Sequence, residues 1–347
     1  MITYAILINP GHNRVYFEAS KKLSLVELEI ACQRFSNECT GFSLSEIEGV
    51  IYVTFQTSNP LSSSDILWLS KLSFAYALFE LRKNQEETCL VPVRKAQSYY
   101  FNDDLSTILK YSGKTNEIFT RLMLNIAVLT SDFYESQDIS VLDPVAGKGT
   151  TLFEALIAGY NAFGVEIVPK AVHETSVYFK KYLETGKYKH TYKKEKISGE
   201  AKSLKAEFHR FEFAKSKEDQ KLNRFLQLCI VEGDSKHAGR FFKKNRFHVI
   251  VGDLPYGVHH SNVANQNQSF TRNPKELLQA CLPGWAACLK PGGVIVLSWN
   301  KFVLKREQLE EVFTEHGLAV MNESPYNQFE HRVDQAINRD IIVAKKK

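Results

Sequence analysis

The pattern of apolar and polar positions divides the chain into two parts. In residues 1–95, short runs of β-branched and aromatic residues alternate with stretches in which apolar residues recur every three or four positions. The runs predict strands, and the recurring stretches predict amphipathic helices. The expected strands are 4–9, 49–56 and 88–93, and the expected helices are 24–35 and 62–81. Ser24 is expected to cap the first helix, with Glu27 completing a capping box. We therefore expect a small α+β domain over residues 1–95.

From residue 112 onward, strands alternate with helical stretches. After a polar, aromatic linker at 96–111 and a helix at 118–130, six apolar runs have the length and composition of buried strands. They are 139–143, 161–167, 228–234, 247–253, 292–299 and 339–346. This alternation predicts an α/β fold over 112–347, with a largely parallel sheet and helices on both faces. The interval 170–225 is too long for an ordinary crossover and is expected to hold extra helices.

Composition fits a globular protein of two domains. The chain has 347 residues, of which 44% are apolar and 24% charged, and a chain of this length is expected to divide. No apolar run is long enough to span a bilayer, and the first residues lack the basic segment of a signal peptide. The six cysteines form no Cys-x-x-Cys pair. We therefore expect reduced thiols in a cytoplasmic protein, with no metal site, disulfide frame or membrane contact.

The net charge of +5 is unevenly distributed. Residues 170–224 hold fifteen Lys and Arg against eight Asp and Glu. Such a local surplus can attract a polyanion such as nucleic acid. A charge run by itself more often marks a solvated insertion, so this signal gains meaning only from motifs elsewhere.

A glycine-rich segment, Asp143–Thr150, follows the first strand of the second part. It lacks the first glycine of a Walker A loop and the Ser or Thr that should follow Gly-Lys. The Ser-Gly-Lys-Thr at 112–115 also lacks the earlier glycine. A dinucleotide fingerprint needs a third glycine, and Leu152 stands in its place. Neither a phosphate loop nor a dinucleotide site therefore explains the segment.

Three acidic residues at strand ends suggest a different ligand. Glu166 ends the next strand, where an acid can accept hydrogen bonds from both ribose hydroxyls of an adenosine. Asp143 would repel a pyrophosphate but would attract an ammonium or sulfonium group, and it could also cap the loop backbone. Asp234 follows a later strand and could accept a hydrogen bond from the adenine amino group. S-adenosyl-L-methionine has an amino-acid end, a cationic sulfur and a ribose, and so matches these features.

A second motif, Asp253-Leu254-Pro255-Tyr256-Gly257, ends the fourth strand. In an open α/β sheet, ligands bind beyond the carboxyl ends of the strands. A carboxylate and the following carbonyl could accept the hydrogens of an exocyclic amine, which is a poor nucleophile because its lone pair is delocalised. The tyrosine would stack on the base, and the proline would stiffen the turn. Alone the motif is more often a strand-ending turn, but with the glycine loop it indicates a base-modifying site.

The two motifs resemble those of Rossmann-like, class I S-adenosylmethionine-dependent methyltransferases. The closer resemblance is to THUMP-associated tRNA guanine-N2-methyltransferases. Their Asp-Pro-x-x-Gly-x-Gly-Thr-x-x-x-Glu-Ala and Asp-Pro-Pro-Tyr-Gly signatures are similar to 143–155 and 253–257. Leu254 replaces the first proline of the second signature. The first 95 residues are similar to the ferredoxin-like lead-in of that family, although the chain before residue 110 is short for a lead-in with a complete THUMP domain.

The resemblance implies S-adenosyl-L-methionine as cofactor and RNA, above all tRNA, as substrate. It also implies that the helix after residue 116 approaches the ligand. The residues implied in catalysis are Asp253, Leu254, Pro255 and Tyr256. Those implied in cofactor binding are Phe119, Thr120, Asp143, Pro144, Ala146, Gly147, Gly149, Thr150, Glu166, Ile167, Asp234, Ser235 and Asp253.

Three functions remain open from the sequence. The first is methylation of guanine N2 in tRNA. The second is methylation of adenine N6 or cytosine N4 in DNA or rRNA, because the same motif chemistry serves any exocyclic amine. The third is a nucleic-acid-binding protein that keeps the fold without catalysis, against which the intact acidic and glycine positions argue.

Overall fold

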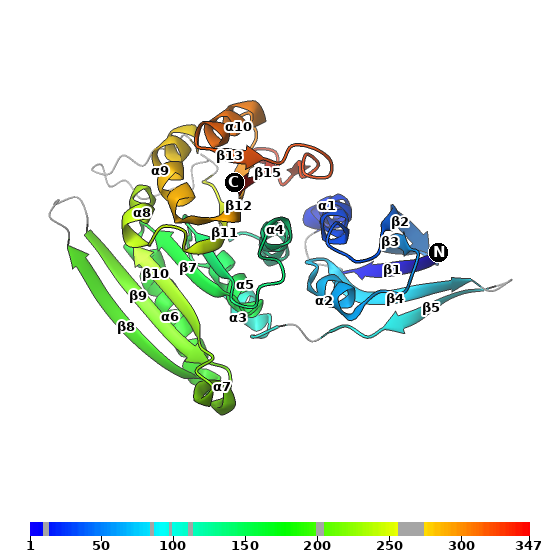
Figure 1. Cartoon of the computed structure of the whole chain (residues 1–347), viewed down its shortest axis with the longest axis horizontal. Coiled ribbons are helices and arrows are strands. Elements are labelled where there is room, and N and C mark those ends of the chain that lie inside the picture. Colours follow the sequence, from blue (N-terminus) through cyan, green and yellow to red (C-terminus); the bar gives the residue numbers. More distant parts are fainter. Residues whose placement is uncertain (10–13, 84–86, 97–98, 110–113, 199–204, 256–273) are drawn as a thin grey trace. The chain divides into compact units, whose positions relative to one another are not determined.

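The computed structural model describes residues 1–9, 14–83, 87–96, 99–109, 114–198, 205–255 and 274–347. The chain forms two compact units (Figure 1). Unit 1 consists of Met1–Ser98 and Asn322–Gln335, and unit 2 consists of Tyr99–Met321 and Ala336–Lys347. No helix in the described ranges has the length and apolar character needed to cross a membrane.

Unit 1 is built on a five-stranded antiparallel sheet with the order β2-β3-β1-β4-β5. The β1-α1-β2-β3-α2-β4 succession is that of the ferredoxin-like motif, with β5 added at one edge. Its elements are β1 (Ile2–Ile8), α1 (Arg14–Cys32), β2 (Cys39–Ile47), β3 (Val50–Thr57), α2 (Ser63–Lys71), β4 (Ala75–Lys83), β5 (Thr88–Val93) and β14 (His331–Arg332).

Both expected helices of unit 1 need correction. Ser24 lies inside α1 rather than at its start, and its hydroxyl donates to the Ser20 carbonyl at 2.5 Å. Glu27 is fully buried and accepts hydrogen bonds from the backbone and hydroxyl of Ser73 instead of capping the helix. The second helix ends at Lys71, and residues 75–83 form a strand paired with β1. Pairing across the sheet overrides the helical spacing there, because β-structure depends on tertiary context.

The segment Asn322–Gln335 belongs to unit 1 although it lies near the end of the chain. The Tyr326 hydroxyl lies 3.4 Å from the side-chain oxygen of Gln33, and the Lys22 ammonium donates to the Glu330 carbonyl at 3.4 Å. The chain therefore leaves unit 2 and returns to it within its last 26 residues.

Unit 2 is built on a large mixed sheet with the order β13-β15-β12-β11-β6-β7-β10-β9-β8. Its strands are β6 (Ser140–Asp143), β7 (Asn161–Glu166), β8 (Lys189–Ser198), β9 (Lys205–Ala214), β10 (Leu226–Glu232), β11 (Phe247–Asp253), β12 (Leu289–Asn300), β13 (Leu318–Val320) and β15 (Asn338–Lys346). Its helices are α3 (Asp104–Thr107), α4 (Glu117–Thr130), α5 (Thr150–Ile157), α6 (Pro169–Thr185), α7 (Lys217–Lys221), η1 (Ser235–His237), α8 (Ala238–Phe241), α9 (Pro274–Cys288) and α10 (Arg306–Glu315).

The five central strands are parallel and confirm the expected Rossmann-like fold. If β6, β7, β10, β11 and β12 are numbered 1 to 5 in chain order, their order across the sheet is 3-2-1-4-5. This is the doubly wound arrangement. Helices α8, α9 and α10 bury one face of this sheet, where Phe163, Ile250 and Leu297 meet Trp285 and Phe313 in one apolar cluster. The order reverses between β6 and β11, and this switch point is where such sheets bind ligands.

The expected extra helices in 170–225 are wrong. After α6, residues 189–198 and 205–214 pair as β8 and β9, and they extend the sheet because β9 pairs antiparallel with β10. Among the residues of this interval that the structure describes, the five-residue α7 is the only helix after α6. Phe211 and Phe213 of β9 pack on Phe179 of α6, with ring centroids 5.2 and 5.3 Å apart. In 210–213, the charged residues alternate with the buried Phe211 and Phe213, which is the period-two signal of a half-buried strand.

Candidate active site

Acidic residues gather at one edge of the large sheet, where β6, β7, β10 and β11 end. We call this edge the carboxyl edge. Asp143, Glu166, Glu232 and Asp253 are the last residues of these four strands. Glu166 and Glu232 are direct partners in the parallel ladder between β7 and β10. The fold therefore gathers at the switch point three acids that the sequence had singled out, Asp143, Glu166 and Asp253.

The glycine loop is fastened to the end of β7 through Glu166. One carboxylate oxygen of Glu166 accepts the Gly147 N–H at 2.7 Å, and the other accepts the Val168 N–H at 2.8 Å. Gly147 and Gly149 have φ angles of +52° and +86°, which favour glycine because a side chain there is strained. A Cβ placed on Gly147 would meet nothing within 4 Å. The loop therefore presents an open backbone surface beside a fixed carboxylate.

Close packing between α5 and the sheet does not need the missing third glycine. A Cβ added to Gly164 of β7 would lie 2.8 Å from the side chain of Leu152 and 2.9 Å from the Cβ of Ala146. The small residue therefore sits on the strand, and the large residue sits on the helix. Leu152 can occupy the fingerprint position because Gly164 leaves room for it.

Asp143 is 97% buried and lies against the loop. One of its oxygens accepts the Val145 N–H at 3.0 Å, and the Thr151 hydroxyl also donates to the carboxylate. Burial raises the pKa of Asp143 to about 7, while these hydrogen bonds oppose the shift. Burial likewise raises the pKa of Glu166, against the hydrogen bonds from the loop backbone. Both acids would be stabilised as carboxylates by a nearby positive charge.

Asp253 is held by two hydroxyl groups that sequence analysis had not linked to it. The Ser298 hydroxyl of β12 donates to one carboxylate oxygen, and the Thr115 hydroxyl donates to the other at 2.8 Å. A guanidinium nitrogen of Arg339, from β15, lies 3.9 Å from the second oxygen. Three separate segments therefore orient this carboxylate at the end of β11.

Phe119 connects the start of α4 to this site. It is fully buried, and the Arg339 guanidinium lies over its ring at 4.5 Å from the centroid. Asn116 caps the helix by accepting the Phe119 N–H at 3.1 Å. The Thr120 hydroxyl donates to the Asn116 carbonyl at 3.1 Å, so it supports the same helix end. The structure thus places Phe119 near Asp253 through Arg339, whereas Thr120 stabilises the helix.

Asp234 and Ser235 follow β10 and have structural partners. One Asp234 oxygen accepts the Lys236 N–H at 3.0 Å, and the other lies 2.9 Å from the Lys236 ammonium. The Ser235 hydroxyl accepts the indole N–H of Trp285 at 3.0 Å. These contacts fix the turn after β10. The free lone pairs of a carboxylate still allow Asp234 to accept a further hydrogen bond.

The remaining candidate residues differ in accessibility. Leu254 is buried, and its N–H donates to the Ser298 carbonyl at 2.9 Å, which continues the pairing of β11 with β12. Pro255 is exposed, and Tyr256 lies outside the described residues. Pro144, Ala146 and Thr150 are buried within the loop, and Ile167 is partly exposed.

Ser298, Thr115 and Arg339 are the site residues that sequence reasoning missed. Thr115 occurs in a rejected phosphate-loop pattern, and Ser298 in an apolar run that was interpreted as purely structural. A polar residue within a buried strand could have drawn attention to Ser298. Nothing local in the sequence links Arg339 to a residue 86 positions earlier, because their proximity depends on the strand order.

A group of potential metal ligands lies next to the carboxyl edge. Donor atoms of Glu207, His209 and Glu232 lie within 4.8 Å of one another. However, Glu207 is paired with the Lys194 ammonium at 2.5 Å and with that of Lys196 at 3.5 Å. The lysines therefore already supply the positive charge that a metal ion would bring, and the group is satisfied as an ion-pair network.

Comparisons with known proteins find similarity only at a low level. No protein-family model matches the chain, and no curated protein matches it significantly. Among solved structures, TrmN from Thermus thermophilus is 11% identical with a TM-score of 0.45, covering 100% of both chains. An rRNA methylase from Streptococcus thermophilus is 11% identical with a TM-score of 0.35, covering 68% of this chain and 99% of its own. Magnesium protoporphyrin IX methyltransferase from Synechocystis PCC 6803, solved with bound S-adenosylmethionine, is 12% identical with a TM-score of 0.37, covering 68% and 87%.

Two of the three are named as a methylase and a methyltransferase. Likeness of this degree does not identify a substrate or any catalytic residue. The fold of unit 2 is therefore assigned from the order and register of its own strands.

Proposed function

We propose that the protein is an S-adenosyl-L-methionine-dependent RNA methyltransferase that modifies the exocyclic N2 of a guanosine in tRNA. The observation that carries this proposal is the position of Asp253. Its carboxylate lies at the switch point, oriented by Ser298 and Thr115, on the strand next to the one that ends in Asp143. Transfer to an amine would bring the acceptor and the cofactor together, and this arrangement would place the carboxylate and the loop on adjacent strands.

The loop and its neighbouring acids fit the charge and shape of the cofactor. A buried carboxylate with a raised pKa, such as Asp143, is stabilised when a cationic ligand binds, and S-adenosyl-L-methionine carries both an ammonium and a sulfonium. Glu166 would accept hydrogen bonds from the ribose, because each of its oxygens retains a lone pair beyond the one used by the loop. The open backbone at Gly147 would allow the methionine part to lie close.

The role of Asp253 would be to orient the amine and to strengthen it as a nucleophile. The amino group would donate a hydrogen bond to the carboxylate, which directs the nitrogen lone pair toward the methyl group. When bound, the cofactor would supply the methyl group through cleavage of its S–CH3 bond, which leaves a neutral thioether. As the new bond to nitrogen forms, the nitrogen loses a proton, which Asp253 can accept or pass to water. Most of the rate gain would come from this positioning.

Support for RNA rather than a small molecule is the basic surplus in 170–224 together with the base-modifying motif. A guanine in a folded RNA would have to enter the site from solvent, beyond the ends of the strands. Pro255, which follows β11, is exposed on that side. Guanine N2 is preferred over other exocyclic amines because of the resemblance of 143–155 and 253–257 to the guanine-N2 family.

The test is methyl transfer from labelled S-adenosyl-L-methionine into undermodified bulk tRNA, followed by nucleoside mass analysis. N2-methylguanosine is the expected product, and its absence in the Asp253→Asn variant would link it to this site. Label on adenine or cytosine would move the substrate to another exocyclic amine. Cofactor binding without transfer to tRNA, rRNA or DNA would favour a non-catalytic binding protein.

A further inference from the structure

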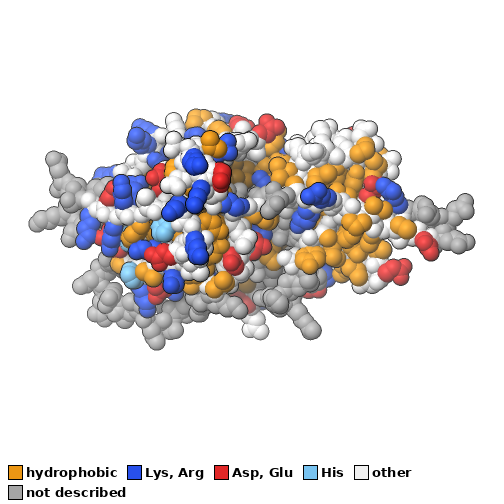
Figure 2. All heavy atoms as spheres, turned by 90° about the horizontal axis from the view of Figure 1, so that it is seen from below, with side chains coloured by type: hydrophobic (Ala, Val, Ile, Leu, Met, Phe, Trp, Pro, Cys, Tyr) orange, Lys and Arg blue, Asp and Glu red, His pale blue; other side chains and the backbone are white. Residues whose placement is uncertain are grey.

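Six basic side chains form a group at the end of unit 2 opposite the carboxyl edge. We call it the basic tip; it consists of Lys181, Lys187, Lys189, Lys217, Lys221 and Arg224. They come from the end of α6, the start of β8 and the α7 segment, which the antiparallel hairpin brings together. All six are exposed. Figure 2 views the molecule from the side on which α7 lies in Figure 1, and Lys and Arg side chains gather over that part of unit 2.

The basic tip is not neutralised by nearby acids. The segments 180–189 and 215–224 together hold eight Lys and Arg and three Asp and Glu. Within the part of the chain that the structure describes, none of the six side chains forms an ion pair, whereas the neighbouring Lys180 lies 3.9 Å from Glu184. Unpaired, exposed cations with few acids between them produce a positive potential that extends into solvent.

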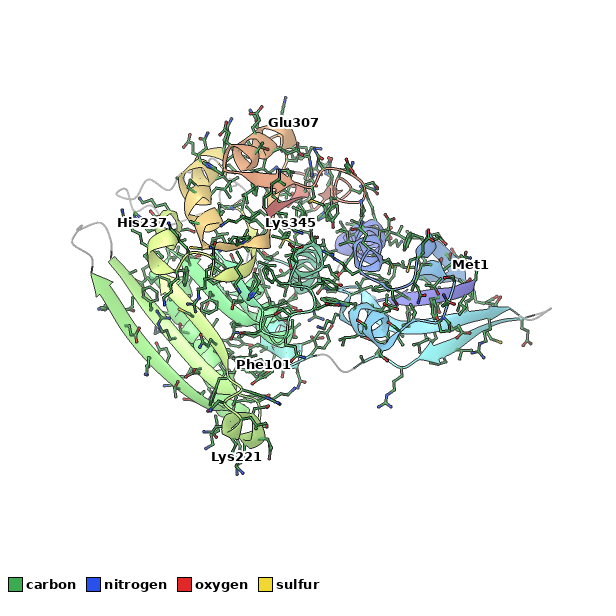
Figure 3. All side chains as sticks on the ribbon, viewed as in Figure 1. Met1, Phe101, Lys221, His237, Glu307 and Lys345 are labelled. Carbon is green, nitrogen blue, oxygen red and sulfur yellow. The ribbon has the colours of Figure 1, made fainter. Side chains whose placement is uncertain are left out.

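The tip lies far from the site that would hold a reacting base. Glu207 is paired in register with Lys196 at the carboxyl edge, and Ala214 with Lys189 at the tip. Seven residues of extended strand separate these two positions, a distance of about 24 Å. Figure 3 shows Lys221 and His237, which follows β10, at opposite ends of this part of the sheet. A single nucleotide bound at Asp253 could not reach both ends.

Packed aromatic side chains support the segments that carry the basic tip. Phe101 is 98% buried and contacts the rings of Tyr182 and Tyr188, with centroids 5.6 and 5.0 Å away. The Tyr182 hydroxyl donates to Asp104 at 2.8 Å, and the Lys215 ammonium donates to the Tyr99 carbonyl at 3.1 Å. These contacts hold α6, the hairpin and the chain before α3 together, so the backbone segments that carry the tip are anchored to the fold.

We infer that the basic tip binds the phosphate backbone of an RNA whose modified base lies at the carboxyl edge. This inference rests on the proposed function. A small RNA-binding domain can span about 16 base pairs of a duplex, so one RNA helix is long enough for both contacts. Because phosphate contacts position a nucleic acid without reading its sequence, the tip would select folded RNA of sufficient length and leave the choice of base to the site.

The test compares two double variants with the same change in net charge. Lys217→Glu/Lys221→Glu reverses two tip cations, and Lys170→Glu/Lys305→Glu reverses two exposed cations outside the tip. Binding of bulk tRNA would be measured over a range of salt concentrations, with S-adenosyl-L-methionine affinity and melting temperature as controls for folding. We expect the tip variant to bind tRNA about tenfold more weakly at low salt, with a log–log salt slope smaller by about 2. The control variant should change each quantity much less.

Several results would overturn the inference. Unchanged tRNA binding in the tip variant would remove the tip from the RNA-binding surface, and equal weakening in both variants would show an effect of net charge alone. Wild-type binding to vesicles that contain phosphatidylserine, without binding to tRNA, would assign the tip to membranes instead. Because binding is measured apart from transfer, tip-dependent binding without any methylated product would contradict the proposed reaction and leave the RNA contact standing.

Discussion

The two ends of the large sheet carry charged residues in opposite arrangements. At the carboxyl edge, Asp143 is buried, and its pKa is raised to about 7 by that burial. The lysines beside this edge, Lys194 and Lys196, are paired with Glu207. At the basic tip, the cations are exposed and form no ion pairs within the described residues. The carboxyl edge thus holds a buried acid, whereas the basic tip exposes its cations to solvent.

This difference separates two kinds of recognition that a count of charges cannot distinguish. Buried acids cost free energy unless a specific ligand or hydrogen bond compensates them, so they favour one small cation in one position. Exposed cations cost little and attract any polyanion, with strong dependence on salt. The basic residues of 170–224 that the structure describes therefore do not act as one patch, because the fold pairs some of them with acids and exposes others at the basic tip.

The largest effect is expected from removing the carboxylate of Asp253. Asp253→Asn should lower methyl transfer by about 10²–10⁴-fold, the range for a lost proton acceptor, because the amide cannot accept both hydroxyl donors and an amine proton. Cofactor affinity should change little, since the glycine loop after β6 and Glu166 at the end of β7 stay intact. Single-turnover transfer and calorimetric cofactor binding check the two parts. A large loss of affinity would show that Asp253 acts mainly on the cofactor.

A second prediction concerns the pH dependence of cofactor binding through Asp143. Its carboxylate must be ionised to attract the cationic ligand, so affinity should fall as pH drops below about 7, by up to tenfold per pH unit. Asp143→Asn should weaken binding and flatten this dependence. Calorimetry between pH 5.5 and 8.5 measures both, and a wild-type affinity that is constant over this range would contradict the assignment.

The same residue gives a stability test without ligand. Because the pKa of Asp143 is raised in the folded chain, its ionisation lowers stability as pH rises toward and through about 7. Asp143→Asn should therefore raise the melting temperature of the ligand-free protein, more at pH 8 than at pH 5. A variant that is less stable than wild type at pH 8 would show that the hydrogen bonds from Val145 and Thr151 outweigh the burial cost.

A smaller effect is expected when the support of Asp253 is weakened. Ser298→Ala removes one hydroxyl donor and leaves the carboxylate in place. Transfer should fall about 10–10²-fold, corresponding to the roughly 1.5–3 kcal/mol of a hydrogen bond to a charged group, with cofactor affinity unchanged. Steady-state kinetics should show the loss in kcat rather than in KM for the cofactor. Ser62→Ala, which removes a helix cap in unit 1, serves as a control for loss of a serine hydroxyl.

The smallest effects are expected from replacing single lysines, one at the basic tip and one beside the carboxyl edge. Lys221→Gln should lower the salt slope of tRNA binding by about 1, as expected for one lost phosphate contact. Lys194→Gln should leave the slope nearly unchanged, because its charge is already paired with Glu207. It should instead raise the pKa of His209, which is lowered first by burial and further by the charge of Lys194. NMR titration of His209 and salt-dependent binding distinguish the two variants.

The sequence alone determined the parallel core of unit 2 and its main acids. Continuous apolar runs identify buried strands because both faces of such strands are covered, and the acids at their ends follow directly. The switch point could therefore be expected near Asp143 and Asp253. By contrast, the helical spacing of 62–81 gave the wrong element for 75–83, because pairing with β1 is a property of the folded sheet.

Only the tertiary structure decided how these residues work together. Ser298, Thr115 and Arg339 converge on Asp253 from positions far apart in the chain, since strand order rather than sequence distance sets their separation. Gly164 compensates for Leu152 across two elements. The hairpin β8–β9 places the basic residues of 170–224 at two ends of the sheet, because antiparallel strands carry neighbouring segments in opposite directions. Local pattern thus identifies the chemical groups, and the long-range pairing of strands assigns each of them a partner.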